Sequence, residues 1–196
     1  MKYNYQTIIK SVKRLVKAAN DSPRNKYSPS VWKYHLELVA KYSLALAKKL
    51  KADAEVAELS AYLHDYASLL DVKNAERHHI VGAELAGKIL TKLGLPEKKN
   101  KAVKNSILTH RGSIKLAKRT LEAKILASAD AMSHFYYIPD MFYLAYGVHQ
   151  LNSDEGAAWL KAKLRRSWKK IVLPAGRKMI ARDRKFFLEV LDQVSK

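Results

Sequence analysis

A histidine followed directly by an aspartate, His64-Asp65, interrupts an almost wholly apolar stretch that runs from Leu59 to Leu70. Burying an imidazole beside a carboxylate costs free energy unless a charged or hydrogen-bonding partner meets both groups. A divalent cation satisfies both groups at once. We therefore interpret the doublet as part of a metal site.

Further histidines and an aspartate stand where a core residue would be expected. His35 shares a helical face with Leu38, Val39 and Tyr42, and this spacing points it inward. The others lie in apolar segments or at their ends: His78, His79, His110 and Asp130. Each alone is more often a hydrogen-bonded core residue than a ligand. Together they come from five consecutive helices and need partners in one interior, which favours a shared metal centre.

The chain contains no cysteine, which excludes disulfides, zinc–thiolate sites and thiol nucleophiles. Any metal must be held by nitrogen and oxygen ligands. We predict one or two divalent ions per chain, chosen from Fe, Mn, Co, Ni, Zn and Mg.

The net charge of +19 indicates an anionic partner, although lysines on the polar faces of amphipathic helices explain it about as well. Residues 161–185 carry eleven lysines and arginines against one acid, Asp183. With Trp159 and Trp168 beside them, these residues could bind nucleic acid through this segment. The two tryptophans fit the buried face of an ordinary helix better.

Apolar residues recur at helical spacing nearly everywhere, which predicts an all-α fold with a basic C-terminal helical extension. No apolar run reaches the length of a membrane span, and the N-terminus lacks a secretory signal, so we expect a cytoplasmic protein that does not contact membranes. The expected helices cover about 5–19, 29–50 (with Ser28-Pro29 at its start), 53–70, 76–93, 97–110 (stopped by Gly112), 119–137 (stopped by Pro139) and two or three segments of 141–195.

These segments predict an N-terminal helix and loop over residues 1–27, a metal-binding domain over 28–145, and basic C-terminal helices over 146–196 that pack on the same globule. The oligomeric state is not readable from the sequence.

The order His, His-Asp, His, His, Asp resembles the HD superfamily of metal-dependent phosphohydrolases over residues 28–145, and this resemblance implies an HD-domain helical bundle. The residues around these ligands are most similar to those of the YqeK-like hydrolases of symmetrical dinucleoside tetraphosphates. The matching motifs are Leu63-His-Asp-Tyr-Ala67, His78 placed four before Gly82-Ala-Glu-Leu-Ala86, Ile107-Leu-Thr-His-Arg-Gly112 and Lys124-Ile-Leu-Ala-Ser-Ala-Asp130.

The resemblance implies a ligand set for two ions. The first ion would be held by His35, His64, Asp65 and Asp130, and the second by His78, His110 and a bridging Asp65. His79 competes with His78, whose spacing to Gly82 fits the motif better. We interpret His134 as a neighbour that orients Asp130 or as a surface residue, with metal ligation as a further alternative, and His149 as structural.

One position departs from the family pattern. Superfamily members often have a lysine three positions after the His-Asp aspartate, where it meets substrate phosphate, but this chain has Ser68. Arg111 is a replacement candidate because its guanidinium can bind two phosphate oxygens, and Lys124 is a second candidate. With Asp65, these two residues form the predicted catalytic set.

The resemblance implies hydrolysis of a phosphomonoester, phosphoanhydride or phosphodiester by metal-activated water, with a phosphorylated small molecule, a nucleotide first of all, as substrate. One alternative is a non-catalytic or regulatory HD-type module that binds nucleotide or nucleic acid through its basic surface. A few relatives use the same ligands with iron and oxygen to oxidise a substrate, which is a further alternative.

Overall fold

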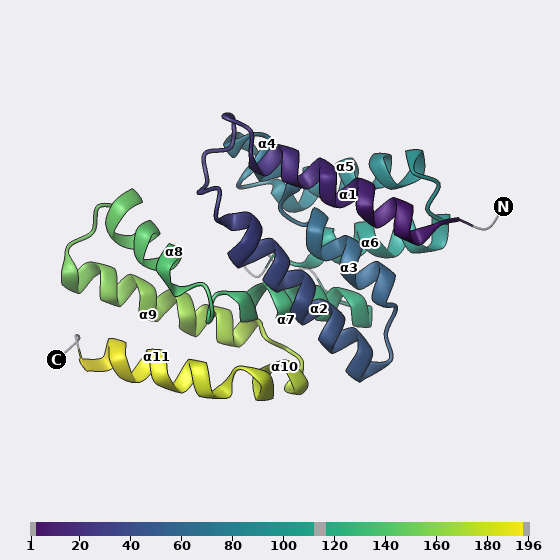
Figure 1. The fold of residues 1–196 in the computed structure, drawn as a ribbon. Helices are drawn as coiled ribbons and strands as arrows, with labels where there is room; N and C mark the ends of the chain where they lie inside the picture. Colours follow the sequence, from purple (N-terminus) through teal and green to yellow (C-terminus); the bar gives the residue numbers. More distant parts are fainter. Residues whose placement is uncertain (1–2, 112–116, 194–196) are drawn as a thin grey trace.

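The computed structural model describes residues 3–111 and 117–193, and over these residues the chain is helical without strands (Figure 1). The prediction of an all-α fold is confirmed. The helices are α1 (Tyr5–Asn20), the π-helix η1 (Trp32–Leu36), α2 (Glu37–Leu50), α3 (Ala54–Leu63), α4 (Tyr66–Leu70), the 3-10 helix η2 (Val72–Asn74), α5 (His78–Lys92), α6 (Glu97–Thr109), α7 (Leu121–Ser133), α8 (Ile138–Phe142), the π-helix η3 (Tyr143–Val148), α9 (Ser153–Lys170), α10 (Pro174–Met179) and α11 (Ala181–Gln193). Within the described ranges, none of them is both long enough and apolar enough to cross a membrane.

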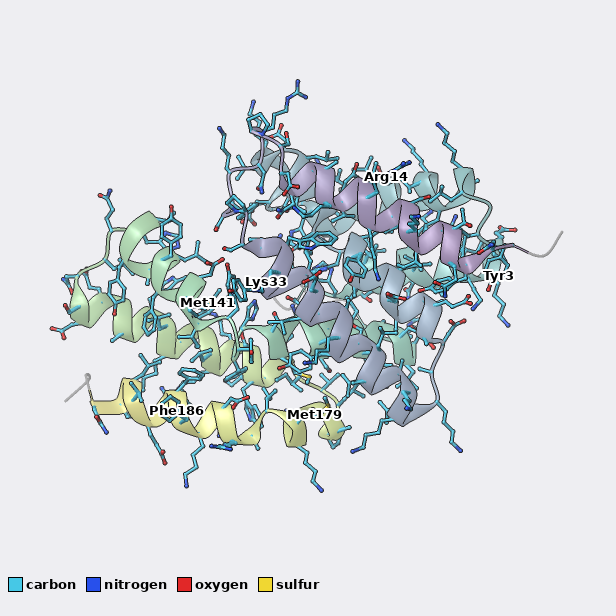
Figure 2. The ribbon with its side chains drawn as sticks, in the orientation of Figure 1. Tyr3, Arg14, Lys33, Met141, Met179 and Phe186 are labelled. Carbon is cyan, nitrogen blue, oxygen red and sulfur yellow. The ribbon has the colours of Figure 1, made fainter. Side chains whose placement is uncertain are left out.

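Helices α2 and α7 lie at the centre of the molecule, between two hydrophobic cores (Figure 1). The first core packs α1, α3, α5 and α6 against them through residues such as Val12, Leu63 and Ile107. The second core packs α9, α10 and α11 against the other side, through residues such as Leu160. Basic side chains such as Arg14 on α1 project from the outer surface (Figure 2). The C-terminal helices therefore pack against α2 and α7, and α7 carries Asp130.

The prediction of one continuous helix over residues 53–70 is wrong, because the helix breaks at His64-Asp65. Helix α3 ends at Leu63, α4 begins at Tyr66, and Asp65 has φ −106° and ψ 5°. In an unbroken helix consecutive side chains point about 100° apart. The break brings the two candidate metal-binding groups together: Nε2 of His64 lies 3.3 Å from Oδ2 of Asp65.

Glycine at position 82 allows α5 to pass close to this break. A Cβ atom on Gly82 would be in ordinary contact with the His64 carbonyl oxygen at 3.4 Å and with Ile107 at 3.5 Å, so an alanine fits here but a side chain larger than a methyl group would press on the His-Asp turn. The small residue that follows His78 in the family motif thus has a packing reason.

Three predicted helix boundaries also differ in the structure. The Ser28-Pro29 pair belongs to a turn, closed by the Val31 N–H donating to the Ser28 carbonyl at 3.0 Å, and regular helix begins only at Trp32. The helix expected to end at Tyr137 ends at Ser133. Pro139 starts α8 instead of stopping a helix, since its fixed φ suits a first turn. The predicted stop signal Gly112 lies outside the described residues.

Candidate metal centre

The structure brings all six predicted ligand residues together. They come from separate elements: His35 from η1, His64 and Asp65 from the turn between α3 and α4, His78 from the start of α5, His110 from the end of α6 and Asp130 from α7. Two imidazole pairs lie at the centre. The Nε2 atoms of His35 and His64 are 3.2 Å apart, and those of His78 and His110 are 3.1 Å apart.

Asp65 lies between the two imidazole pairs. Its Oδ2 atom is 3.3 Å from the Nε2 atoms of both His35 and His64, and its Oδ1 atom is 3.5 Å from Nε2 of His78. One carboxylate oxygen therefore faces each pair, which is the arrangement that a bridging ligand requires.

Asp130 closes the side of the first pair. Its Oδ1 atom lies 3.7 Å from Nε2 of His35 and 3.9 Å from Nε2 of His64. Its Oδ2 atom accepts a hydrogen bond from the Lys170 ammonium group of α9. Burial alone would raise the pKa of Asp130, but Lys170 and the neighbouring imidazoles hold this pKa well below its usual value.

Backbone carbonyls fix the tautomers of three histidines. The Nδ1–H groups of His64, His78 and His110 donate to the carbonyl oxygens three residues earlier, at 2.8, 2.6 and 2.6 Å. A neutral imidazole that donates from Nδ1 carries a lone pair on Nε2. All three lone pairs therefore face the centre, and such a second hydrogen bond typically orients a metal-ligating histidine.

The tautomer of His35 follows from a hydroxyl. The Ser133 hydroxyl donates its only proton to the Asp130 carbonyl at 2.7 Å, so it must accept from Nδ1–H of His35 at 3.0 Å. Nε2 of His35 then also presents a lone pair to the centre.

This donor set fits a divalent cation. Facing lone pairs repel each other, and two imidazole nitrogens bound at about 2.1 Å to one ion would lie roughly 3.0–3.4 Å apart, as these pairs do. When no cation is bound, a proton takes its place on His64. Burial disfavours the charged form of His64, but the charge of Asp65 outweighs the effect of burial and raises the pKa of His64 to about 9. The described residues thus form histidine and aspartate groups that could hold metal.

A protein-family model for the HD domain matches residues 32–134, which is more than half of the chain and includes every predicted ligand. The chain belongs to the HD domain family. The predicted membership is confirmed, while the narrower likeness to the YqeK-like hydrolases stays a prediction.

Curated and solved relatives agree with this membership. The HD chain is 32% identical to Ribonuclease Y of Streptococcus sanguinis over 110 residues, which cover 56% of this chain but only 18% of that protein. It therefore spans about a fifth of the length of the curated relatives that it matches. YpgQ of Bacillus subtilis has a TM-score of 0.73 at 18% identity, with 97% of this chain and 95% of the other covered. An HD-superfamily hydrolase of Bacillus thuringiensis has a TM-score of 0.70 at 17% identity, with 97% and 96% covered. At these identities the two structures share the fold.

The candidate metal centre of the HD chain borders a cavity of about 670 Å³. Asp65, Asp130 and three of the predicted ligand histidines line this cavity, together with His134, Ser167 and Val172. Six basic side chains also line it: Arg111, Lys118, Lys163, Arg166, Lys169 and Lys170. Four of these six residues come from α9, so the C-terminal extension completes a site whose acidic half is in the HD domain.

One face of α9 touches the centre directly. Lys163, Ser167 and Lys170 are spaced four and three residues apart and share a helical face. Lys170 pairs with Asp130, the Ser167 hydroxyl lies 2.9 Å from Nδ1 of His134, and Lys163 lines the cavity. Burial lowers the pKa of Lys163, which weakens its hold on its proton.

The predicted catalytic cations have different positions. Arg111 lines the cavity, and its guanidinium group also pairs with the Glu76 carboxylate at 2.6 Å. Lys124 is exposed on α7, and it is not among the residues that line the cavity. Lysines and an arginine of α9 line the cavity instead.

His79 and Ser68 also find their places. His79 is buried, and burial with the neighbouring His78 lowers its pKa, but its nitrogens join none of the described groups that could hold a metal. Ser68 is buried next to the Tyr27 hydroxyl and brings no charge to the position where relatives carry lysine. The basic run in residues 161–185 is the sequence signal for these cations, but its pattern alone indicates a solvent-exposed face or a nucleic-acid contact and not the wall of a cavity.

Proposed function

We propose that this HD chain is a metal-dependent phosphohydrolase that acts on a phosphorylated small molecule of nucleotide size. One observation carries the proposal: lone pairs of four imidazoles and two carboxylates converge beside a cavity that six basic side chains also line. A volume of about 670 Å³ suits a single nucleotide-like ligand. Donors for metal and cations around the same cavity suit a phosphate group held between them.

The ligand assignment that we propose follows the geometry. His35, His64, Asp65 and Asp130 would hold a first divalent ion, and His78, His110 and Asp65 a second. Divalent ions held by these residues would supply positive charge to phosphate oxygens and lower the pKa of a bound water, which would serve as the nucleophile toward phosphorus while the bond to the leaving oxygen breaks. Lys170 holds one oxygen of Asp130 and so leaves the other oxygen facing the centre.

Phosphate recognition falls to the basic walls of the cavity. Lys163, Arg166 and Lys169 form no ion pair with a described carboxylate, so their charges remain available to a substrate. Preorganised cations contribute most where charge accumulates on the phosphoryl oxygens. We infer that these residues of α9 take over the task of the lysine that Ser68 replaces, and that Arg111 assists from the opposite rim.

Turnover by purified protein would test this function. Protein loaded with Mn, Co, Fe, Zn or Mg is incubated with phosphomonoesters, phosphodiesters, nucleoside phosphates and dinucleoside polyphosphates, and the products are resolved by chromatography. We expect metal-dependent release of phosphate or a nucleotide, lost in Asp65→Ala and kept in His149→Ala. If the metal-loaded protein binds nucleotides but hydrolyses none, the regulatory alternative is correct.

RNA is a second candidate substrate, favoured by the 32% identity to Ribonuclease Y of Streptococcus sanguinis within the HD region. The tryptophan argument for nucleic acid is weakened, because Trp168 packs edge-on against Phe135 and lies under Arg177 and Arg184, 5.3 and 4.5 Å from its ring centre. Labelled RNA oligonucleotides in the same assay separate the two: cleavage would favour RNA, and salt-dependent binding without cleavage would favour a binding module.

A further inference from the structure

His134 lies beside the proposed first metal position, although the family pattern does not include it. It follows Asp130 by one helical turn, and its ring stacks nearly parallel on that of His35, with centroids 6.0 Å apart and an interplanar angle of 7°. It lines the cavity with His35 and Asp130. Its Nε2 atom is 3.9 Å from Oδ1 of Asp130, the oxygen that faces the centre.

The tautomer of His134 is fixed by α9. The Ser167 hydroxyl donates its proton to the Lys163 carbonyl oxygen at 3.0 Å, so it accepts from Nδ1–H of His134 at 2.9 Å. Nε2 of His134 therefore carries a lone pair, as in the four histidines already described. His35 and His134 are oriented by the same device, a serine hydroxyl whose proton is already donated to a backbone carbonyl.

A lone pair that faces a carboxylate oxygen is repelled unless a positive charge lies between them. Lys170 bonds the other oxygen of Asp130, and Lys163, whose charge also acts on His134, forms no described side-chain hydrogen bond or ion pair with either group. The donor atoms of His35, Asp130 and His134 all lie within 4.8 Å of one another. Ligands bound at about 2.1 Å in octahedral geometry lie roughly 3.0–4.2 Å apart, so a small movement would place all three on one ion.

We propose that His134 is a fifth protein ligand of the first metal ion, oriented by Ser167 of α9. This inference rests on the proposed metal centre and extends it. A third imidazole at this position favours transition metals over Mg²⁺, whose preferred ligands are oxygens. The C-terminal helix would then help to select the metal as well as bind phosphate.

Proton NMR of the Co²⁺-loaded protein tests the assignment without an activity assay. Unpaired electrons of Co²⁺ shift the N–H protons of directly bound imidazoles far outside the ordinary range, and each of these histidines keeps its Nδ1–H. In wild-type protein we expect a shifted, exchangeable signal that is lost in His134→Ala while the others remain. Co²⁺ affinity at the first position should fall about 10-fold or more.

Two further variants support the interpretation. His149→Ala, a histidine packed on Trp159 away from the cavity, should change neither the signals nor the affinity. Ser167→Ala removes the acceptor but keeps the ligand, so the His134 signal should remain in a shifted position with weaker binding. If all wild-type signals persist in a folded His134→Ala variant, His134 is not a ligand. If wild-type protein gives no shifted signals at all, the metal centre itself is wrong.

Discussion

Replacing Asp65 with asparagine should abolish the stabilisation of the fold by divalent ions at both proposed positions. One oxygen of Asp65 faces the His35 and His64 pair and the other faces His78, so a single neutral amide weakens both positions. His110 is assigned to the second position because its Nε2 atom lies 3.1 Å from that of His78, although its donor nitrogen is also within 4.8 Å of donor atoms of His64 and Asp130. His110→Ala should therefore weaken mainly the second ion.

The expected size of the effect follows from mass action and chain length. An ion at about 100 times its Kd stabilises the folded state by ~2.7 kcal/mol, so two sites give roughly 5 kcal/mol. For a chain of 196 residues, each kcal/mol moves Tm by about 2–4 °C. Wild-type protein should therefore gain ~10–20 °C, His110→Ala about half of that, and Asp65→Asn almost nothing.

Thermal unfolding followed by circular dichroism, with Mn²⁺, Co²⁺ or Zn²⁺ and with a chelator, measures these shifts. Each variant is compared with itself in chelator, which removes any change in the stability of the metal-free fold. His149→Ala serves as the matched control and should behave as wild type. A full wild-type shift in Asp65→Asn would refute the bridging role, and a complete loss of the shift in His110→Ala would show that the two positions are not separable.

The remaining predictions concern pH, phosphate recognition and packing. The pKa of His64 is raised from 6.5 to about 9, so its protonation stabilises the metal-free fold fully below pH 6.5 and this contribution is lost as the pH rises to about 9; because metal competes with that proton, the metal-induced shift in Tm should be larger at pH 9 than at pH 7. Lys163→Met should lower kcat/KM about 10- to 100-fold in steady-state assays, whereas Arg165→Met, exposed on the same helix outside the cavity, should not. Gly156→Ala should destabilise the fold by about 1–3 kcal/mol in urea unfolding, because the new methyl group meets a tyrosine ring. Gly87→Ala meets only a flexible lysine and should be neutral or stabilising by up to ~1 kcal/mol.

The proposed ligand residues could be identified in the sequence because their chemistry conflicts with their surroundings. His64 and Asp130 stand among small and apolar residues of helices, where a polar group needs a partner. Such a conflict is visible without knowledge of the fold. The sequence alone could not show which atoms meet, since that depends on the packing of η1, α5 and α7 around the turn at His64-Asp65.

The break at His64-Asp65 was not predictable from helical spacing. The apolar pattern continues without interruption from Leu59 to Leu70, and neither glycine nor proline marks a stop. Tertiary contacts decide the local conformation here, as the close approach of α5 at Gly82 illustrates. Helical spacing alone therefore predicts a continuous helix at the place where the site needs two adjacent side chains to converge.

The cations of the site were hidden for a different reason. A lysine on an amphipathic helix has the same sequence pattern whether its polar face meets solvent or a cavity. In α9, Arg165 is exposed outside the cavity, while Lys163 and Lys170 reach the centre. Only the packing of α9 against α7 separates these two environments.

The same packing explains why the site extends past the end of the matched HD region at residue 134. Lys170 pairs with Asp130, and Ser167 fixes the tautomer of His134, so two residues of α9 act on groups of α7. The family resemblance places a lysine three residues after the His-Asp aspartate, whereas this chain has Ser68 there and cations on α9. Because a cation can meet a phosphate from any side of a cavity, the element that carries the cation can differ as long as its charge faces the cavity. We therefore expect residues 146–196 to take part in the proposed chemistry of this HD chain, with the basic segment as one wall of the site and not as a separate binding surface.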